Sequence, residues 1–306
     1  MLRPLKVDFQ QFMEKASEIL IGKNDELELS LIAALCRGHL LIEDIPGVGK
    51  TTLVQLVSKL LGLNFSRIQF TNDLLPSDIL GFNLYDKNKG EFVFKKGPIF
   101  GELVLADELN RASPKTQSAL LQVMEEHHIS IDGEDFKMDG PFLVFATQNP
   151  FQQIGTSPLP ESQLDRFFMG ISLGLPDRKA EKEILKSTHV KERLQNVLPV
   201  MMKDQLIFHQ NEVLKVHVKE ELYDYVLNLM DYGRNHLEES FALSTRAAKD
   251  LILAAKARAY LYDRDYVILE DIQGLCPYVL GHRVGFERGL VYGINIVKEM
   301  VLKVRP

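Results

Sequence analysis

The chain has 306 residues, 45% hydrophobic and 25% charged, which is enough for one large or two ordinary globular domains. Its net charge of −6 disfavours a dedicated nucleic-acid binder, because such proteins usually carry a basic excess. No apolar run reaches the roughly 18 residues of a membrane span, and the first residues lack the apolar core of a signal peptide, so we expect a cytoplasmic protein. Cys36 and Cys276 lie far apart and form neither a metal-binding spacing nor a disulfide framework.

Short apolar runs alternate with helical patterns in the first half of the chain. The runs lack the apolar–polar alternation of a half-exposed strand, as is typical of a parallel sheet covered on both faces. We therefore predict an open α/β sheet. Its predicted strands are residues 39–43, 67–70, 103–106 and 142–146.

Two helices are predicted between these strands. The first follows a glycine-rich turn, carries leucines and valines on one face, and ends at Gly62. The second begins with Ser113 as N-cap and Pro114 as its first helical residue. Its inward-facing residues are predicted to be Leu120, Val123 and Met124.

Two segments interrupt this pattern with predicted β-hairpins. Residues 71–100 form a loop-rich insertion, in which residues 83–94 indicate a hairpin. Residues 128–138 alternate around Asp132-Gly133, which is a short-range hairpin signal. Each predicted hairpin precedes a predicted core strand.

The pattern becomes almost entirely helical after Pro176. Helical periodicity covers residues 178–189, 219–235 and 244–262. We therefore predict two domains, an α/β domain over residues 1–176 and an all-helical domain over residues 177–306.

The stretch GHLLIEDIPGVGKTTLVQLVSKLLG, residues 38–62, indicates a phosphate-binding loop. A phosphate cradle needs inward-pointing backbone N–H groups and gains from the positive end of a helix dipole. Gly47, Gly49 and the helix that starts near Lys50 supply both. Asp44 stands where the strict pattern G-x-x-x-x-G-K-[ST] has its first glycine, but it ends the strand just before the turn. The predicted nucleotide-binding residues are Pro46, Gly47, Val48, Gly49, Lys50, Thr51 and Thr52.

The chemistry of ATP hydrolysis is predicted from groups around this loop. Lys50 is expected to reach the β and γ phosphates, and the Thr51 hydroxyl to hold Mg²⁺. Asp107 ends an apolar strand and is expected beside Thr51, on the ion or next to it. Glu108 is expected to polarise the attacking water. Asn149 follows another buried strand and is expected to orient that water.

These segments together resemble AAA+ ATPases, and specifically the MoxR family. The resemblance covers nearly the whole chain and implies an αβα nucleotide domain with two β-hairpin insertions, followed by a helical lid. The departures at Asn72, Gly101-Glu102 and Ser113 touch no nucleotide-contacting position. The matching stretches are residues 38–52, RIQFTNDLLPSDILGF (67–82), GPIFGELVLADELNRASPKTQSALLQVMEE (97–126), FATQNPFQQIGTSPLPESQLDRF (145–167) and LSTRAAKDLILAAKARAYLYDRDYVILEDI (243–272).

The resemblance also implies roles for two arginines. Arg166, in Leu164-Asp-Arg-Phe167, corresponds to an arginine finger that reaches the γ-phosphate held by a neighbouring subunit. Arg246, in Leu243-Ser-Thr-Arg246, resembles the sensor 2 residue that contacts the γ-phosphate and couples the lid to the nucleotide. Arg111 is left without an assigned role.

The function implied is an ATP-hydrolysing, Mg²⁺-dependent motor that remodels or matures a partner protein. The resemblance further implies a homo-oligomeric, hexameric ring and a partner that carries a von Willebrand A domain. An AAA+ motor acting on nucleic acid stays open as the alternative, although the mixed charges of both hairpins disfavour a phosphate backbone. A GTPase is disfavoured because Asn88-Lys89-Gly90-Glu91 lacks the Asp of a guanine reader.

Overall fold

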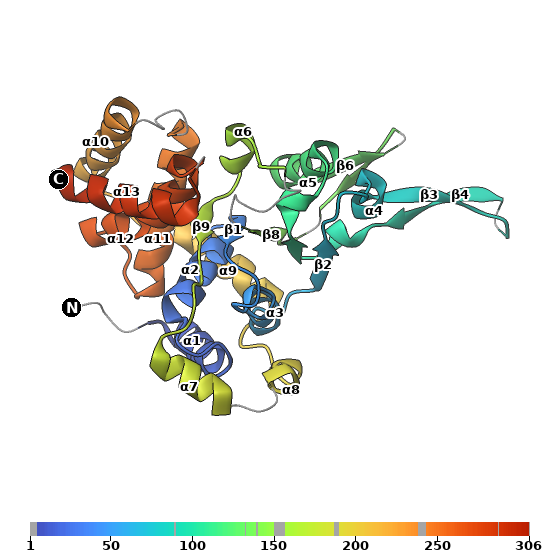
Figure 1. Ribbon diagram of the computed structural model, residues 1–306, viewed down its shortest axis with the longest axis horizontal. Coiled ribbons are helices and arrows are strands. Elements are labelled where there is room, and N and C mark those ends of the chain that lie inside the picture. The colour runs from blue at the N-terminus through green and yellow to red at the C-terminus, as the bar shows by residue number, and fades with distance from the viewer. Residues whose placement is uncertain are drawn as a thin grey trace.

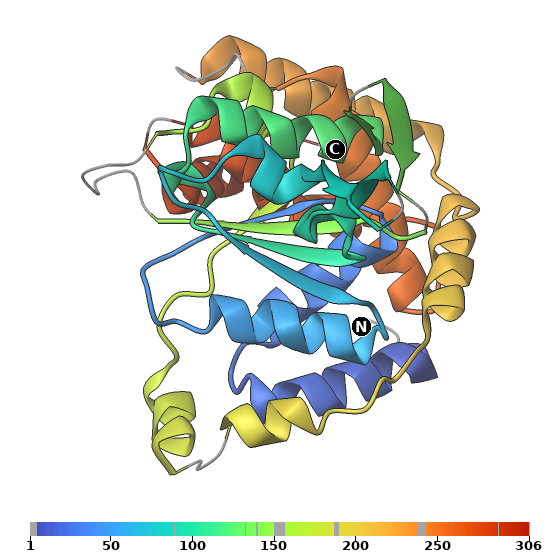
Figure 2. The same cartoon turned by 90° about the vertical axis from the view of Figure 1, so that its right-hand side faces the viewer.

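The computed structural model describes residues 5–88, 90–131, 133–138, 140–149, 157–186, 190–237, 243–286 and 288–305. A parallel five-stranded sheet lies at its centre, with the strand order β2-β5-β8-β1-β9. Figure 2 shows this sheet between a layer that contains α3 (Lys50–Leu60) and a layer that contains α5 (Pro114–Glu126). Its strands are β1 (Leu40–Glu43), β2 (Phe65–Gln69), β5 (Leu103–Asp107), β8 (Leu143–Gln148) and β9 (Met169–Ile171).

Four of the strands were predicted, within three residues at each end. β9 was missed because it has only three residues, which is too short to show a pattern. Its central Gly170 is tightly packed, since a Cβ there would lie 2.7 Å from a Leu290 methyl group.

Both faces of the sheet are buried at β1, β5, β8 and β9, as the unbroken apolar runs predicted for the first three. The edge strand β2 was also predicted to be buried, but Arg67 and Gln69 are exposed there. Successive residues of a strand point to opposite faces, so each strand contributes to two hydrophobic clusters. In β5, for example, Leu105 belongs to the cluster on the α3 side and Val104 to the cluster on the α5 side. Because all five strands are parallel, their carboxyl-terminal ends lie at one edge of the sheet.

The two predicted hairpins are present in the described residues. The first consists of β3 (Gly81–Asp86) and β4 (Glu91–Lys96), between α4 (Pro76–Leu80) and the 3₁₀ turn η1 (Pro98–Phe100). It projects from the body of the molecule (Figure 1). The second consists of β6 (His128–Ile131) and β7 (Glu134–Lys137). Two predicted turn residues, Lys89 and Asp132, lie outside the described residues.

Helices make up nearly all of the described structure after Pro176, as predicted. Figure 1 shows α10 to α13 gathered on the side of the sheet away from the β3–β4 hairpin. The other helices of the chain are α1 (Val7–Ile19), α2 (Asn24–Leu35), the 3₁₀ turn η2 (Leu109–Arg111) and α6 (Glu161–Leu164). The helices after Pro176 are α7 (Arg178–Lys186), α8 (Val190–Gln195), α9 (Lys203–Leu214), α10 (Glu220–His236), α11 (Thr245–Leu261), α12 (Leu269–Val284) and α13 (Leu290–Lys303).

The helical part and the sheet part share a hydrophobic core. One cluster runs from Phe9 in α1 through the α3 side of the sheet to Met300 in α13. The predicted domain boundary at Pro176 therefore crosses a continuous apolar interior. Among the described residues, no helix combines the length and apolar character needed to cross a membrane.

Candidate active site

The predicted phosphate loop connects β1 to α3. Gly49 is the N-cap of α3 with φ 100°, and Gly47 has φ 88°, so both adopt a backbone conformation that favours glycine. A Cβ at Gly47 would meet no atom within 4 Å, so this turn faces open space. The Lys50 ammonium donates to the carbonyl oxygens of Asp44, at 2.5 Å, and Ile45, at 3.0 Å. The loop thus carries its lysine at the helix N-terminus, where an anion is stabilised.

Asp44, the departure from the standard pattern, has a structural task. One of its carboxylate oxygens accepts hydrogen bonds from the Ser172 hydroxyl, at 2.9 Å, and from the Gly174 backbone N–H, at 2.6 Å. Its other oxygen accepts a bond from the Ile45 N–H at 2.8 Å. Asp44 therefore ties the start of the phosphate loop to the end of β9.

Asp107 and Glu108 lie at the carboxyl-terminal end of β5, next to the end of β8. The Thr147 hydroxyl donates to Asp107 at 2.7 Å and accepts from the Glu108 backbone N–H at 2.9 Å. Glu108 has φ 57°, a strained value for a residue with a side chain, and that single hydroxyl helps to hold it there. No role was predicted for Thr147 from the sequence.

Asn149, which was expected to orient the attacking water, contacts Glu108. Its side-chain amide donates to the Glu108 carboxylate at 3.4 Å, and its own backbone carbonyl accepts from the Asn110 amide at 3.1 Å. The other Glu108 oxygen accepts from the Gln69 amide of β2 and from Arg111, both at 3.1 Å. Glu108 is thus half-buried and surrounded by donors from three elements, which can orient a water bound to its carboxylate.

Sequence reasoning missed Gln69 and its neighbour Arg67. Arg67, also on β2, donates to the second Asp107 oxygen at 2.7 Å. Both residues are polar side chains in a strand that was predicted to be buried. The available signal was the alternation of polar Arg67 and Gln69 with apolar Ile68. β2 is an edge strand of the sheet, and the side chains at its two exposed polar positions reach the carboxylates at the end of β5.

The loop lysine and the strand-end carboxylates lie close enough to interact electrostatically. Burial lowers the pKa of Lys50 from its usual value of 10.5, while Asp44, Asp107 and Glu108 act in the opposite direction. The structure thus brings together the predicted phosphate-binding and hydrolytic groups.

The residues present fit a magnesium ion bound with a nucleotide. Mg²⁺ prefers oxygen ligands and is usually held by one or two carboxylates, substrate phosphates and water. The Thr51 hydroxyl, in the first turn of α3, and the buried Asp107 carboxylate provide such oxygens. Among the described residues, no group of three or more His, Cys, Asp or Glu side chains could hold a metal ion.

The turn between α1 and α2 borders the phosphate loop. A Cβ on Gly49 would lie 3.5 Å from a Leu20 methyl group. Ile21-Gly22 lies in this turn, after α1 and before α2.

Arg166 and Arg246 lie together near the amino-terminal ends of the strands, whereas the phosphate loop follows the carboxyl-terminal end of β1. Both bind Glu125, in the last turn of α5, at 3.0 Å and 2.7 Å. α5 starts beyond the carboxyl end of β5, and its 13 residues run back about 20 Å. Arg166 closely precedes β9, whose first residue pairs with Leu40, the first residue of β1. The lid arginine is therefore grouped with the predicted finger.

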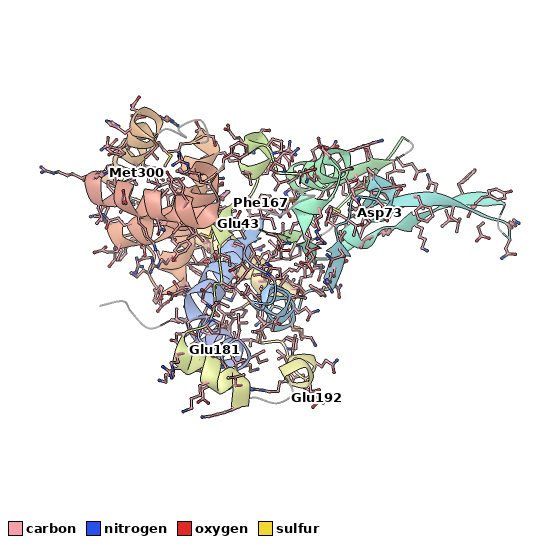
Figure 3. The ribbon with its side chains drawn as sticks, viewed as in Figure 1. Glu43, Asp73, Phe167, Glu181, Glu192 and Met300 are labelled. Carbon is pink, nitrogen blue, oxygen red and sulfur yellow. The ribbon has the colours of Figure 1, made fainter. Side chains whose placement is uncertain are left out.

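A buried ion-pair network joins this arginine pair to the lid helices. Arg283 of α12, with a fully buried side chain, donates to Asp165 at 2.8 Å and to Asp250 at 2.6 Å. Both carboxylate oxygens of Asp165 lie 3.0 Å from the hydroxyl of Ser244, the N-cap of α11, and they share its one hydrogen. Figure 3 shows Phe167, close to this network, and Glu43 in the centre of the molecule, where the sheet meets the helices.

Comparisons with known proteins identify the family of this chain. The family model for the ATPase family associated with various cellular activities (AAA) matches residues 39–169, and the AAA lid domain model matches residues 232–290. The uncharacterised protein YeaC of Bacillus subtilis is 44% identical over 89% of this chain and 85% of its own length. Chaperone MoxR1 of Mycobacterium tuberculosis is 39% identical over 88% of this chain and 74% of its own length. A crystal structure from Cytophaga hutchinsonii, described as a candidate ATPase, has a TM-score of 0.83 and 36% identity, covering 98% of this chain and 94% of that one.

Proposed function

Because this chain belongs to the MoxR family of AAA+ ATPases, we propose that it hydrolyses Mg²⁺-bound ATP as a ring-forming motor that remodels a partner protein. The observation that carries the proposal is the position of Glu108. Its carboxylate lies beside Asn149, and both lie at the strand-end edge that also holds the phosphate loop. When bound, Mg²⁺ neutralises phosphate charge, and Thr51 and Asp107 would hold it.

Each residue of the site has a chemical task in this proposal. The N–H groups of Gly47 to Thr52 cradle the phosphates at the N-terminus of α3. Lys50 offsets their negative charge. Glu108 accepts a proton from the attacking water, and Asn149 fixes the orientation of the carboxylate and water. Gln69 and Arg111 hold the other Glu108 oxygen, so that one oxygen is directed away from the water.

The grouping of Arg166 with Arg246 supports a site completed between subunits. Both guanidinium groups lie at the edge of the sheet opposite the chain's own phosphate loop. We infer that they serve the γ-phosphate of a neighbouring copy, where they stabilise transition-state charge. A closed ring repeats this contact at every interface, and we propose six subunits in the cytoplasm.

A partner with a von Willebrand A domain is part of the proposal. MoxR1, a relative over most of this chain, carries the name chaperone, which supports action on a partner protein. The von Willebrand A domain of that partner follows from the family resemblance alone. The nucleic-acid alternative has no observation in its favour. The described part of the β3–β4 hairpin exposes Leu84, Tyr85 and Phe92, an apolar surface that suits a protein partner better than a phosphate backbone.

The test of the proposed function is complementation between two inactive variants. Glu108→Gln removes the general base from one side of the interface, and Arg166→Ala removes the finger from the other. We expect each variant alone to be nearly inactive and their mixture to recover part of the ATPase activity, because mixed rings contain some intact interfaces. Activity per subunit should also rise with protein concentration. No recovery, with concentration-independent activity in the wild type, would instead support a monomeric P-loop enzyme.

A further inference from the structure

Arg166 and Arg246 converge on the two oxygens of a single carboxylate. Arg166 Nη2 lies 3.0 Å from Glu125 Oε2, and Arg246 Nη2 lies 2.7 Å from Glu125 Oε1. The two arginines come from different elements, the segment between α6 and β9 and the first turn of α11. Two guanidinium groups that contact the same carboxylate repel each other, and the negative charge between them offsets that repulsion.

Each of the two arginines also contacts a group other than Glu125. Arg166 Nη1 donates to the Leu121 carbonyl at 2.7 Å. A carboxylate oxygen of Asp165 lies 3.8 Å from Arg246 Nη1. Asp165 is itself fixed by the N-cap of α11 and by Arg283, as described above. The two arginines therefore form a binding site for one anionic group, and in the single chain the Glu125 carboxylate occupies it.

We propose that Glu125 is a positioning residue that stands in for the γ-phosphate of a neighbouring subunit's ATP until the subunits assemble. The inference rests on the proposed function, because it requires a phosphate presented by a neighbour. All three side chains are reachable from solvent, with exposed fractions of 41% for Glu125, 28% for Arg166 and 44% for Arg246. An incoming phosphate can therefore take the place of the carboxylate without rearranging the core.

Charge favours the replacement of the Glu125 carboxylate by the γ-phosphate. Ion pairs at such exposure are weak, so that releasing Glu125 costs little. A terminal phosphate carries more negative charge than a carboxylate, and its oxygens match the planar donors of guanidinium groups. The Arg246 hydrogen bond lowers the pKa of Glu125, so the stand-in is ionised at neutral pH and competes with the phosphate. Removing its charge should strengthen ATP-dependent assembly.

Sedimentation velocity with Mg²⁺-ATP measures this competition in a Glu108→Gln background, which is designed to bind ATP without consuming it. We expect Glu125→Gln, added to that background, to lower the protein concentration of half-assembly about threefold to tenfold, in line with the loss of two exposed ion pairs. Glu126→Gln is the matched control. Glu126 is the next residue and is also exposed, but it contacts Gln122 and His128 and should leave assembly unchanged.

A double-mutant cycle separates competition from a general effect on folding. The gain from Glu125→Gln should largely disappear when Arg166→Ala is also present, because the phosphate then has lost its main partner. If the Glu108→Gln parent assembles on ATP and Glu125→Gln leaves its half-assembly concentration unchanged or raises it, Glu125 is no stand-in, although the ring proposal survives. If the Glu108→Gln parent does not assemble on ATP at all, both the ring proposal and this inference are wrong.

Discussion

The side-chain amide of Asn149 lies 3.4 Å from the carboxylate of Glu108, although 41 residues separate them in the chain. They meet because β5 and β8 are parallel neighbours in the sheet, so residues that follow the two strands come to the same edge. Thr147 reinforces the contact by bonding both to Asp107 and to the Glu108 backbone. The catalytic pair of the proposal thus follows from the register of two buried strands.

Glu108→Gln is expected to abolish turnover and preserve ATP binding. The substitution keeps the size of the side chain but removes the base that accepts the water proton, and such a base contributes roughly 10²–10⁴ in rate. Phosphate release and equilibrium binding of a fluorescent ATP analogue measure the two properties separately. Full turnover in this variant would remove Glu108 from its proposed role, whereas lost binding would show that its charge matters to the loop instead.

Asp44→Gly is expected to destabilise the protein, although it restores the glycine of the standard phosphate-loop pattern. The change removes the acceptor for Ser172 and for the Gly174 N–H, and a polar group left without its partner costs about 1–3 kcal/mol. Thermal and urea unfolding measure the loss. Asp44→Asn keeps one acceptor oxygen and should lose less, so equal stability of all three proteins would contradict the assigned task of Asp44.

The elements that could be predicted from the sequence are those whose signals are local. The phosphate loop shows its glycines, lysine and helix within a dozen residues, and the buried strands β5 and β8 are uninterrupted apolar runs. Ser113 was predicted as an N-cap, and its side chain accepts from the Thr116 N–H as that role requires. Each of these features depends on residues that are adjacent in the chain.

The features that were missed depend on partners far away in the chain. Gln69 became part of the site because β2 pairs with β5, and the polar positions of β2 indicate an exposed strand face but not which strand it pairs with. The strand β9 is held by neighbours from β1 and the lid helices, not by its own three residues. No role was predicted for Glu125 from the sequence, because its proposed role depends on two arginines that approach from elsewhere in the chain.

His39 is expected to make the protein less stable as the pH falls from 6.5 towards 4. The Val144 N–H donates to its Nδ1 at 3.0 Å, so its Nε2 carries the hydrogen that bonds the Met124 carbonyl at 3.1 Å. Burial lowers the pKa of His39 to about 4, so the unfolded chain binds a proton before the folded one does. Stability is then present above pH 6.5 and lost below it, by about 2 kcal/mol between pH 7.5 and pH 5.

Urea unfolding at these two pH values tests that prediction against His39→Gln. Glutamine offers a donor and an acceptor but does not titrate, so the variant should lose about 2 kcal/mol less than the wild type over the same pH interval. Other buried groups, His282 among them, also contribute to the slope of unfolding free energy against pH. The relevant quantity is therefore the difference in this slope between the wild type and the variant. Identical slopes would show that His39 does not titrate in this window.

Arg283→Met is expected to destabilise the protein by about 3–5 kcal/mol, since it leaves Asp165 and Asp250 without their buried counter-charge. It should also lower ATP turnover in the folded fraction, because Asp165 directly precedes Arg166 and fixes its segment to α11. Urea unfolding and ATPase activity at a temperature where the variant is folded measure the two effects. Asp250→Asn removes the carboxylate that lies away from Arg166, so it should cost stability while retaining most of the turnover. If Arg283→Met is destabilised yet fully active once folded, the network supports the fold alone and does not position the arginine pair.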